Sequence, residues 1–262
     1  MEIRKVTAVY FSPTHGTRAY AEAIAAALSA EYGRIDLTNP FTREQAHEFG
    51  ADELAVIGAP VYAGRLPAVP GGLFGSLRGH GTPAVFLVSY GNRAYDDALL
   101  EEQDLCEAQG FRGVAASAWI APHTFSAKIG AGRPDAADRE KITAFAARVK
   151  ALLDAGLPEG ARLAVPGNRP YREAPAMPFH PEANEACIRC RRCVSACPVR
   201  AIDPAHPEAT DASKCIDCLA CVHACPVHAR GVYHPPLAAV AAGCEAKFLT
   251  PRREPEWFFA GV

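Results

Sequence analysis

Ten cysteines mark this chain of 262 residues, and eight of them form two copies of one pattern. Both copies have the form C-x2-C-x2-C-x3-C-P, and corresponding positions lie 28 residues apart. The eight positions are Cys187, Cys190, Cys193, Cys197, Cys215, Cys218, Cys221 and Cys225. In a reducing compartment, cysteine at this density favours metal binding over disulfide formation. A long spacing that occurs twice seldom arises by chance, so this part of the chain is expected to fold around metal.

Three cysteines of each copy suit an iron–sulfur cube, because a tight loop can turn three thiolates toward three corners of one cluster. Bacterial ferredoxins have this pattern, and their fourth cysteine binds the other cluster. Residues 184–232 resemble the two-[4Fe-4S] ferredoxins. We therefore expect two [4Fe-4S] clusters. The first is assigned to Cys187, Cys190, Cys193 and Cys225, and the second to Cys215, Cys218, Cys221 and Cys197.

Two zinc ions in four-thiolate sites are the competing interpretation. Zinc ribbons use paired CxxC units, in which the third cysteine and the terminal proline of each copy have no role. Cys106 and Cys244 lie outside the pattern, and we interpret both as structural residues. The zinc interpretation would make this part of the chain a non-redox interaction module.

Four arginines surround the first cysteine copy, namely Arg189, Arg191, Arg192 and Arg200. One interpretation is that they form an ordinary solvated loop face. The other is that they raise the reduction potential of the cluster or dock an acidic partner. The sequence leaves both interpretations open.

The N-terminal part alternates apolar runs with helical patterns, which is typical of a parallel α/β sheet. Strands are expected at residues 5–11, 34–37, 53–58, 82–89 and 113–120. Helices are expected at residues 18–30, 94–109 and 135–155, with a short one near 73–77. This succession predicts a doubly wound, flavodoxin-like parallel sheet of five strands in the order 2-1-3-4-5.

A hydroxyl-rich loop follows the first expected strand, where open α/β sheets bind phosphate at a helix N-terminus. Ser12, Thr14 and Thr17 can donate to phosphate oxygens, as can the amides from Thr14 onward. The loop has neither the G-x-x-x-x-G-K-[ST] pattern nor the G-x-G-x-x-G pattern of nucleotide sites. An N-capped helix start without a ligand is the plainer interpretation.

Two more loops follow the third and fourth expected strands, at residues 58–65 and 90–95. Each brings an aromatic ring and a glycine-containing backbone to the same sheet edge as the hydroxyl-rich loop. An isoalloxazine ring needs flat apolar faces and backbone polar groups at its rim. Ordinary surface turns are the alternative.

The first 156 residues resemble flavodoxins, and the whole chain resembles the flavodoxin–ferredoxin fusion proteins. The resemblance implies FMN, with Tyr62 and Tyr95 as stacking rings and Gly91 and Asn92 at the pyrimidine edge. His15 stands where flavodoxins usually have glycine, so a positive φ there would strain it. The expected FMN residues are Ser12, Thr14, His15, Gly16, Thr17, Pro60, Tyr62, Gly64, Ser89, Tyr90, Gly91, Asn92 and Tyr95. Residues 123–126 and 132–135 also resemble this family, either as a loop between FMN and the clusters or as an ordinary structured loop.

The expected organisation is a flavodoxin-like domain at residues 1–156, a proline-rich linker at 157–181, a small α+β ferredoxin-like domain at 182–234, and a tail at 235–262 that packs on the body. A net charge of −2 argues against a nucleic-acid partner, because phosphate-backbone binding needs a strong basic field. No apolar run reaches the roughly 18 residues of a membrane span, so membrane insertion is not expected. We expect a cytoplasmic chain.

The function expected from these features is electron transfer between the clusters and FMN, as a low-potential carrier with redox partner proteins as donor and acceptor. The alternative is an FMN-dependent reductase of a small molecule such as a quinone, with the ferredoxin-like domain as its electron inlet. The sequence contains no nucleophile–histidine–acid set, so no catalytic residue is assigned.

Overall fold

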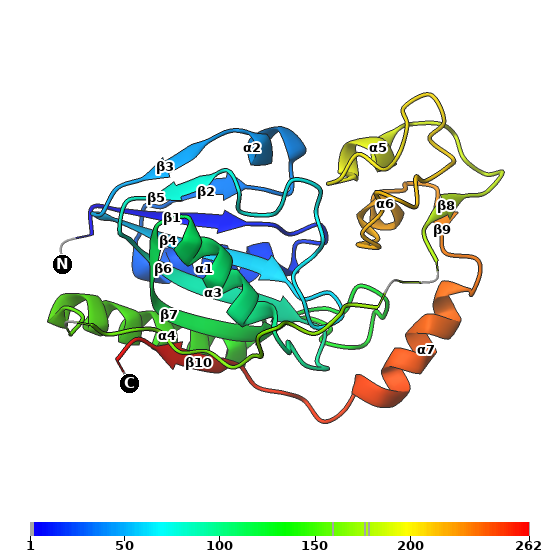
Figure 1. The fold of residues 1–262 in the computed structure, drawn as a ribbon. Coiled ribbons are helices and arrows are strands. Elements are labelled where there is room, and N and C mark those ends of the chain that lie inside the picture. Colours follow the sequence, from blue (N-terminus) through cyan, green and yellow to red (C-terminus); the bar gives the residue numbers. More distant parts are fainter. Residues whose placement is uncertain (1–2, 159, 176, 178, 262) are drawn as a thin grey trace.

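Six strands form the central sheet of the computed structural model, which describes residues 3–158, 160–175, 177 and 179–261. In chain order they are β1 (Lys5–Tyr10), β2 (Gly33–Asp36), β4 (Glu53–Pro60), β6 (Thr82–Tyr90), β7 (Phe111–Ile120) and β10 (Glu256–Phe259). Their spatial order is β10-β7-β6-β4-β1-β2. The first five are parallel to their neighbours, and β10 runs antiparallel to β7 at the edge. Figure 1 shows the strands with their carboxyl ends toward the cysteine-rich part.

Three long helices cover the two faces of this sheet: α1 (Gly16–Leu28), α3 (Ala98–Ala108) and α4 (Ala136–Ala155). Side chains of a strand alternate between its faces, and all nine residues of β6 are buried because both faces are covered. α1 and α4 pack together on one face, around Tyr20, Trp119 and Phe145. α3 packs on the other face, where Leu99 and Cys106 join Phe86.

The prediction of a five-stranded sheet is wrong by one strand. Strand β10 comes from the C-terminal tail and pairs Phe258 with Ala116 and Phe259 with Ala115. Its three consecutive aromatic residues pack on alternate faces: Trp257 and Phe259 on the α1–α4 face, and Phe258 on the other. Among the parallel strands alone, the spatial succession is 2-1-3-4-5, which is the doubly wound order of flavodoxin.

Three short elements between β2 and β6 also differ from the predictions. α2 (Pro40–Glu44) begins behind Asn39, whose side chain accepts from the Phe41 amide at 2.9 Å. β3 (His47–Phe49) pairs with β5 (Leu77–Gly79) in a separate two-stranded sheet. The short helix expected near 73–77 is a single turn, closed by the Leu77 amide on the Phe74 carbonyl, because the strand β5 begins there.

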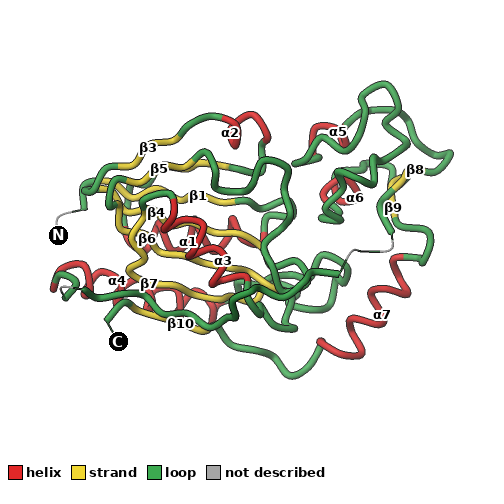
Figure 2. The backbone as a smooth tube through the Cα atoms, in the orientation of Figure 1, coloured by secondary structure: helices red, strands yellow, loops and turns green. Residues whose placement is uncertain are grey.

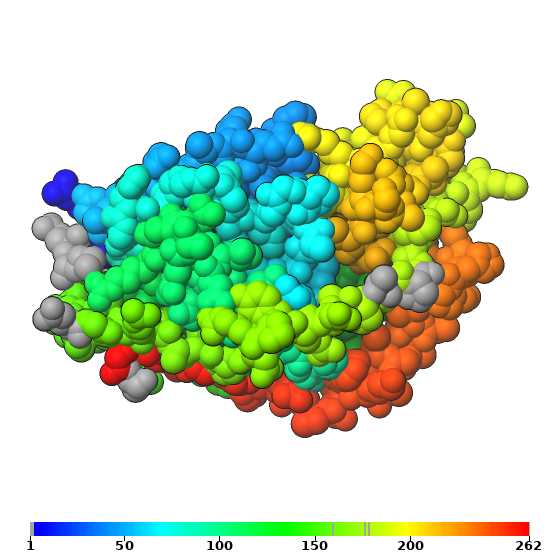
Figure 3. All heavy atoms as spheres, viewed as in Figure 1, coloured from blue at the N-terminus to red at the C-terminus, as the bar shows by residue number. Residues whose placement is uncertain are grey.

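The cysteine-rich part lies at the carboxyl edge of the parallel strands (Figures 1 and 2). It contains β8 (Glu182–Ala183), α5 (Arg192–Ala196), α6 (Ala220–His223) and β9 (Arg230–Gly231), with β8 antiparallel to β9. The chain then forms α7 (Leu237–Phe248) and returns to the sheet as β10. The space-filling view shows the cysteine-rich part in contact with the blue region that contains α2 (Figure 3). Within the described ranges, none of the helices combines the length and hydropathy needed to cross a bilayer.

The linker of residues 157–181 lies along α3 and the loop before it. Arg169 donates to Asp104 with its Nε at 2.8 Å, and Asp97 accepts from the Arg172 amide at 2.7 Å. The Asn168 amide also donates to Asp97, at 2.8 Å. Acidic side chains of α3 and of the loop before it therefore bind the linker.

Candidate functional site

Four cysteines line one small cavity in the C-terminal part: Cys187, Cys190, Cys193 and Cys225. We call them the first cysteine set. Three belong to the first sequence copy and the fourth to the second copy. The remaining lining includes the apolar side chains of Ile188 and Val227. The structure therefore brings together the four side chains that the spacing assigns to one cluster.

The second cysteine set is Cys215, Cys218, Cys221 and Cys197. Burial raises the pKa of the Cys218 thiol, and the neighbouring thiols of Cys221, Cys197 and Cys215 raise it further. Burial likewise raises the pKa of Cys215 to about 12. The desolvated thiols of Cys215, Cys218 and Cys221 resist ionisation unless a cation neutralises them, which is the usual condition of metal-binding cysteines.

The two cysteine loops have positive φ angles at equivalent positions. φ is positive at Arg189, Arg191 and Arg200 in the first copy, and at Asp217, Leu219 and His228 at the equivalent places in the second. Left-handed residues next to right-handed ones turn successive amides toward one point, which creates an anion site. Non-glycine residues bear a cost in this conformation, so the cysteine loops are held in it by the surrounding fold.

Backbone amides point at several of the sulfurs. The Ala201 amide donates to Cys197 Sγ at 3.2 Å, and the Asp217 amide donates to Cys215 Sγ at 3.4 Å. Burial raises the pKa of Cys225, but amide donors from Arg230, Val227, Ala229 and His228 outweigh it and lower the pKa overall. Thiolates that face amide donors match the donor set of an iron–sulfur cluster. Among the described residues, no three His, Cys, Asp or Glu side chains converge closely enough to hold a single metal ion.

A second cavity, of about 420 Å³, lies where the carboxyl ends of β1, β4 and β6 meet the cysteine-rich part. We call it the interdomain cavity. Its volume is within the roughly 300–1,000 Å³ of small-molecule and cofactor sites. Nine of the thirteen residues expected at FMN line it: Ser12, Thr14, Gly16, Thr17, Pro60, Tyr62, Ser89, Tyr90 and Gly91. In its wall the hydroxyls of Thr17 and Ser89 lie 2.8 Å apart, which fixes their orientation.

The other four expected residues lie elsewhere. Asn92 donates to the carbonyls of Phe248 at 2.6 Å and Pro251 at 2.9 Å, and it accepts from the Arg253 amide. The Tyr95 hydroxyl donates to Glu256 at 2.8 Å. Both side chains therefore hold the returning C-terminal segment, and Tyr95 is only 6% exposed. Neither side chain lines the interdomain cavity, and the flavin-edge contact expected of Asn92 is one of its backbone.

Gly64 has a φ of 89° and lies beneath the side chains of Asp96 and Arg172, away from the interdomain cavity. His15 precedes α1 with a φ of 66°, as the strain argument anticipated, and its side chain faces a different space. Burial lowers the pKa of His223 in α6, and the neighbouring His15 lowers it further. The two histidines line the same space, one from each part of the chain.

The cysteine-rich part itself forms one wall of the interdomain cavity, which the sequence did not indicate. Ser213, Lys214, Cys215, Ile216 and Asp217 all line it. Residues 122–125 also line the cavity, and Phe125 packs edge-on against Phe179 of the linker. Most of the loop at residues 123–126, which resembles the fusion family, therefore belongs to the wall of this cavity.

Tyr62 lies where the interdomain cavity meets the second cysteine set. Its ring lines the interdomain cavity. Burial of its hydroxyl raises the pKa of Tyr62, and the charges of Cys218, Asp217 and Cys215 raise it further. The same side chain therefore touches the cavity and neighbours the second cysteine set.

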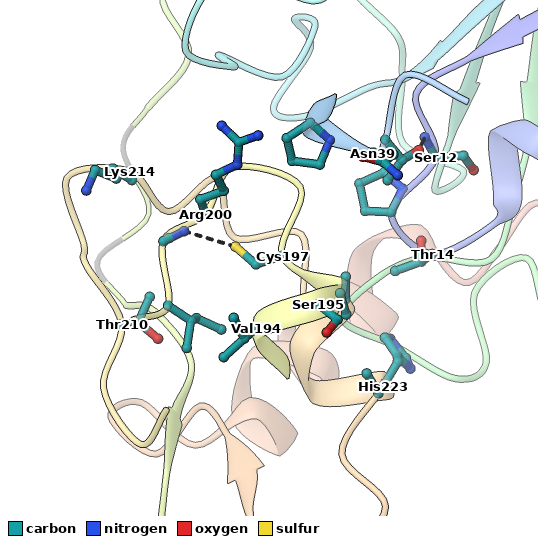
Figure 4. Close-up of a pocket in the computed structure, with 18 of the residues that line it drawn as sticks. Ser12, Thr14, Asn39, Val194, Ser195, Cys197, Arg200, Thr210, Lys214 and His223 are labelled. Carbon is teal, nitrogen blue, oxygen red and sulfur yellow. Dashed lines mark hydrogen bonds between the residues drawn. The ribbon is translucent and has the colours of Figure 1, made fainter. Parts of the chain in front are cut away.

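A larger cleft of about 1410 Å³ opens beside the interdomain cavity. Figure 4 shows Ser12 and Thr14 on one side of it and Cys197 and Arg200 on the other. It shares residues 12–14, residues 122–124 and Lys214 with the interdomain cavity but not Tyr62 or Tyr90. The cleft therefore lies at the hydroxyl-rich loop and not at the aromatic end of the cavity.

These features define a class: a doubly wound α/β domain joined to a domain with two four-cysteine sites. Residues 182–229 match the family model described as "4Fe-4S dicluster domain". No curated protein matches the chain. The C-terminal part is therefore similar to 4Fe-4S dicluster domains, and the N-terminal part has a doubly wound α/β sheet.

Two solved flavodoxins illustrate the neighbours. One, from the domain Archaea, is 17% identical over 56% of this chain and 99% of its own, with a TM-score of 0.38. The other, from Streptococcus pneumonia TIGR4, is 17% identical over 56% of this chain and 97% of its own, with a TM-score of 0.39. At these values the assignment of the sheet rests on its strand order and not on the neighbours.

Proposed function

We propose that this protein is an electron carrier that passes electrons between two [4Fe-4S] clusters and FMN within one chain. One observation carries the proposal: Cys215 belongs to the second cysteine set and also lines the interdomain cavity. A cluster on that set and a flavin in that cavity would be in contact. Joining both on one chain makes the transfer intramolecular, at a high effective concentration.

The residues around the interdomain cavity suit FMN. The hydroxyl-rich loop offers Ser12 and Thr14 beside the start of α1, where an anion is favoured. Tyr62 and Tyr90 offer aromatic surface, and Gly91 leaves backbone without a side chain at the rim. When bound, FMN would supply a centre that accepts one or two electrons. The chain's own residues hold it, exclude water and fix its distance to Cys215.

The two cluster sites differ in exposure, which supports an order of transfer. Cys218 and Cys221 of the second set are buried, whereas Cys190 of the first set is exposed. Ile188 above the first set is 61% exposed and Val227 is 40% exposed. We therefore assign exchange with partner proteins to the first set and exchange with FMN to the second.

The nature of the partner surface follows from the arginines near the first set. Arg191, Arg192 and Arg200 are all exposed, and Arg200 pairs with Glu44 at 2.6 Å. Because Arg200 already has an acidic partner within the chain, the proposed docking face uses Arg191 and Arg192. The remaining basic, partly apolar face would suit an acidic redox partner.

A reductase of a small molecule such as a quinone is the second candidate. The 1410 Å³ cleft is the observation in its favour. The cleft opens at Ser12 and Thr14, however, where the flavin phosphate would lie, and a substrate must reach the ring. The carrier function therefore has the better support.

The test begins with anaerobically purified protein, in which iron, sulfide and released flavin are measured per chain. About eight irons, eight sulfides and one FMN are expected. Cys215→Ser and Cys190→Ser should each lose about half of the iron, whereas Cys244→Ser, outside both sets, should keep all of it. Eight irons without flavin, even after incubation with FMN, would contradict the flavin half of the proposal. Two zinc ions in place of iron would contradict all of it.

A further inference from the structure

The two cysteine copies differ at one buried position beside the clusters. After its last cysteine, the first copy continues Pro-Val-Arg-Ala-Ile and the second Pro-Val-His-Ala-Arg. The final residues are Ile202 and Arg230, 28 positions apart. Ile202 is 3% exposed and Arg230 is 2% exposed. Equivalent places in the repeat therefore hold an apolar side chain in one case and a cation in the other.

The guanidinium of Arg230 is anchored at one end. Nη1 donates to the Pro207 carbonyl at 2.7 Å. Nη2 donates to the carbonyls of Pro181 and Ala209, each at 3.2 Å, and also contacts the Thr210 hydroxyl. Backbone carbonyls satisfy these hydrogens but carry no full negative charge.

The other end of the guanidinium has no partner. Arg230 Nε is buried without a hydrogen-bond acceptor in the part of the chain that the structure describes. No carboxylate within those ranges lies at ion-pair distance from the side chain either. An unsatisfied buried donor is costly, and more so on a charged group, so an acceptor outside the chain is expected.

The position of the side chain shows where such an acceptor would lie. Arg230 lines the small cavity together with the four cysteines of the first set. Arg230 is also near enough to Cys221 of the second set for its charge to act on that thiol. The unpartnered Nε thus lies beside the cavity of the first set, with the second set as its neighbour.

We propose that Arg230 is a positioning residue for the clusters: its Nε donates to a cluster sulfur, and its charge raises the reduction potential of the neighbouring cluster. The inference rests on the proposed occupation of the cysteine sets by clusters, but not on FMN. Reduction adds one electron and no proton to a cluster. A nearby cation in a medium of low dielectric constant stabilises that added charge strongly.

The asymmetry has a functional meaning. Ile202 leaves the repeat-related position uncharged, so two clusters with the same ligand pattern become inequivalent. A difference in potential gives direction to electron flow along the chain of centres.

The test compares Arg230→Gln, Arg230→Ile and Arg230→Lys with the wild-type holoprotein, and uses Ile202→Leu as the matched control. Midpoint potentials are measured by anaerobic potentiometry with EPR detection, after the iron content of each variant is established. Arg230→Gln and Arg230→Ile should shift at least one midpoint potential to more negative values. Arg230→Lys should stay closer to the wild type than either, and Ile202→Leu should match it. Unchanged potentials in an iron-replete Arg230→Gln protein would overturn the proposal.

A second measurement covers the case in which the neutral variants lose iron. Wild-type protein grown with arginine labelled with ¹⁵N only in the guanidinium is reduced and studied by pulsed EPR. A guanidinium ¹⁵N coupling to a reduced cluster is expected, and Arg230→Lys should abolish it. Its absence from the wild type would overturn the hydrogen bond. Protein without iron would refute the proposed function itself, whereas iron-replete protein without flavin still tests Arg230.

Discussion

Arg43 Nη2 donates to the Pro198 carbonyl at 2.7 Å and so joins α2 to the residue that follows Cys197. Nη1 of the same side chain donates to the Leu37 carbonyl at 2.6 Å. The guanidinium is buried, and this burial lowers its pKa. Beside it, Glu44 accepts from Arg200. The short helix α2 is therefore a principal contact between the sheet and the cysteine-rich part.

Arg43→Met should loosen this contact while keeping the apolar stem. A hydrogen bond from a charged group contributes about 1.5–3 kcal/mol, so the free energy of unfolding should fall by that order. Electron exchange between cluster and flavin should slow, because the distance between them is no longer fixed. Urea unfolding and stopped-flow reduction measure the two effects, with exposed Arg139→Met as the control. A rate equal to that of the wild type would show that α2 does not fix the distance.

Glu102 predicts an unusual pH dependence of stability. The side chain is fully buried in α3, and neither carboxylate oxygen has a partner in the described ranges. Burial raises its pKa well above the ordinary value. Because the folded state prefers the protonated form, its contribution to stability is complete below the unfolded pKa of about 4.3 and declines as pH rises toward the folded pKa.

Glu102→Gln removes this titration. The variant should gain stability relative to the wild type between pH 5 and pH 8, by at most about 1.4 kcal/mol per pH unit. Urea unfolding at several pH values measures the difference, and exposed Glu140→Gln should show none. If the free energies of unfolding of Glu102→Gln and the wild type differed by the same amount at every pH, the raised pKa of Glu102 would be contradicted.

His15→Gly should stabilise the protein. His15 has a φ of 66° at the start of α1, a conformation that costs a non-glycine residue roughly 1–2 kcal/mol. Thermal unfolding should therefore shift upward, and FMN should still bind, because the phosphate would contact amides and hydroxyls. Ala19→Gly, one turn further along the helix, should instead destabilise by about 1 kcal/mol. A lower melting temperature for His15→Gly would mean that the imidazole has a contact worth more than the strain.

Asn92→Ala should release the C-terminal segment without affecting the flavin. The loss of three hydrogen bonds to this segment should cost about 1–3 kcal/mol and raise hydrogen exchange in β10. Tyr95→Phe, which removes the bond to Glu256, should act in the same direction. FMN affinity measured by fluorescence should be unchanged. A large loss of affinity in Asn92→Ala would instead restore the flavin-edge role that the sequence suggested.

The parts of the fold that were predictable depend on local patterns. The alternation of apolar residues determined the five parallel strands, and the cysteine spacing determined which four side chains share a cavity. The positive φ at His15 was also foreseeable, because its neighbours match a loop that usually contains glycine. In each case the physical cause lies within a few residues of its effect.

The rest depends on partners far along the chain. Asn92 and Tyr95 suit a flavin edge or a returning tail equally well, and the tail that binds them lies about 160 residues later. Strand β10 has only four residues, too few for its alternation to distinguish it from a loop. α2 did leave a signal, since Asn39 followed by Pro40 is a good helix start, but its five residues were too short for a helical period.

Strand β10 completes the sheet beside β7, although both cysteine loops lie between the two strands in the chain. During synthesis, β7 therefore emerges long before its edge partner, and the cysteines leave the ribosome in the interval. An unpaired sheet edge presents free amide and carbonyl groups that favour pairing with other chains. The edge at β7 therefore stays open until both cysteine loops and α7 have been synthesised. Chains that stall after the second cysteine loop would keep that edge open, a state that proteases and chaperones can recognise.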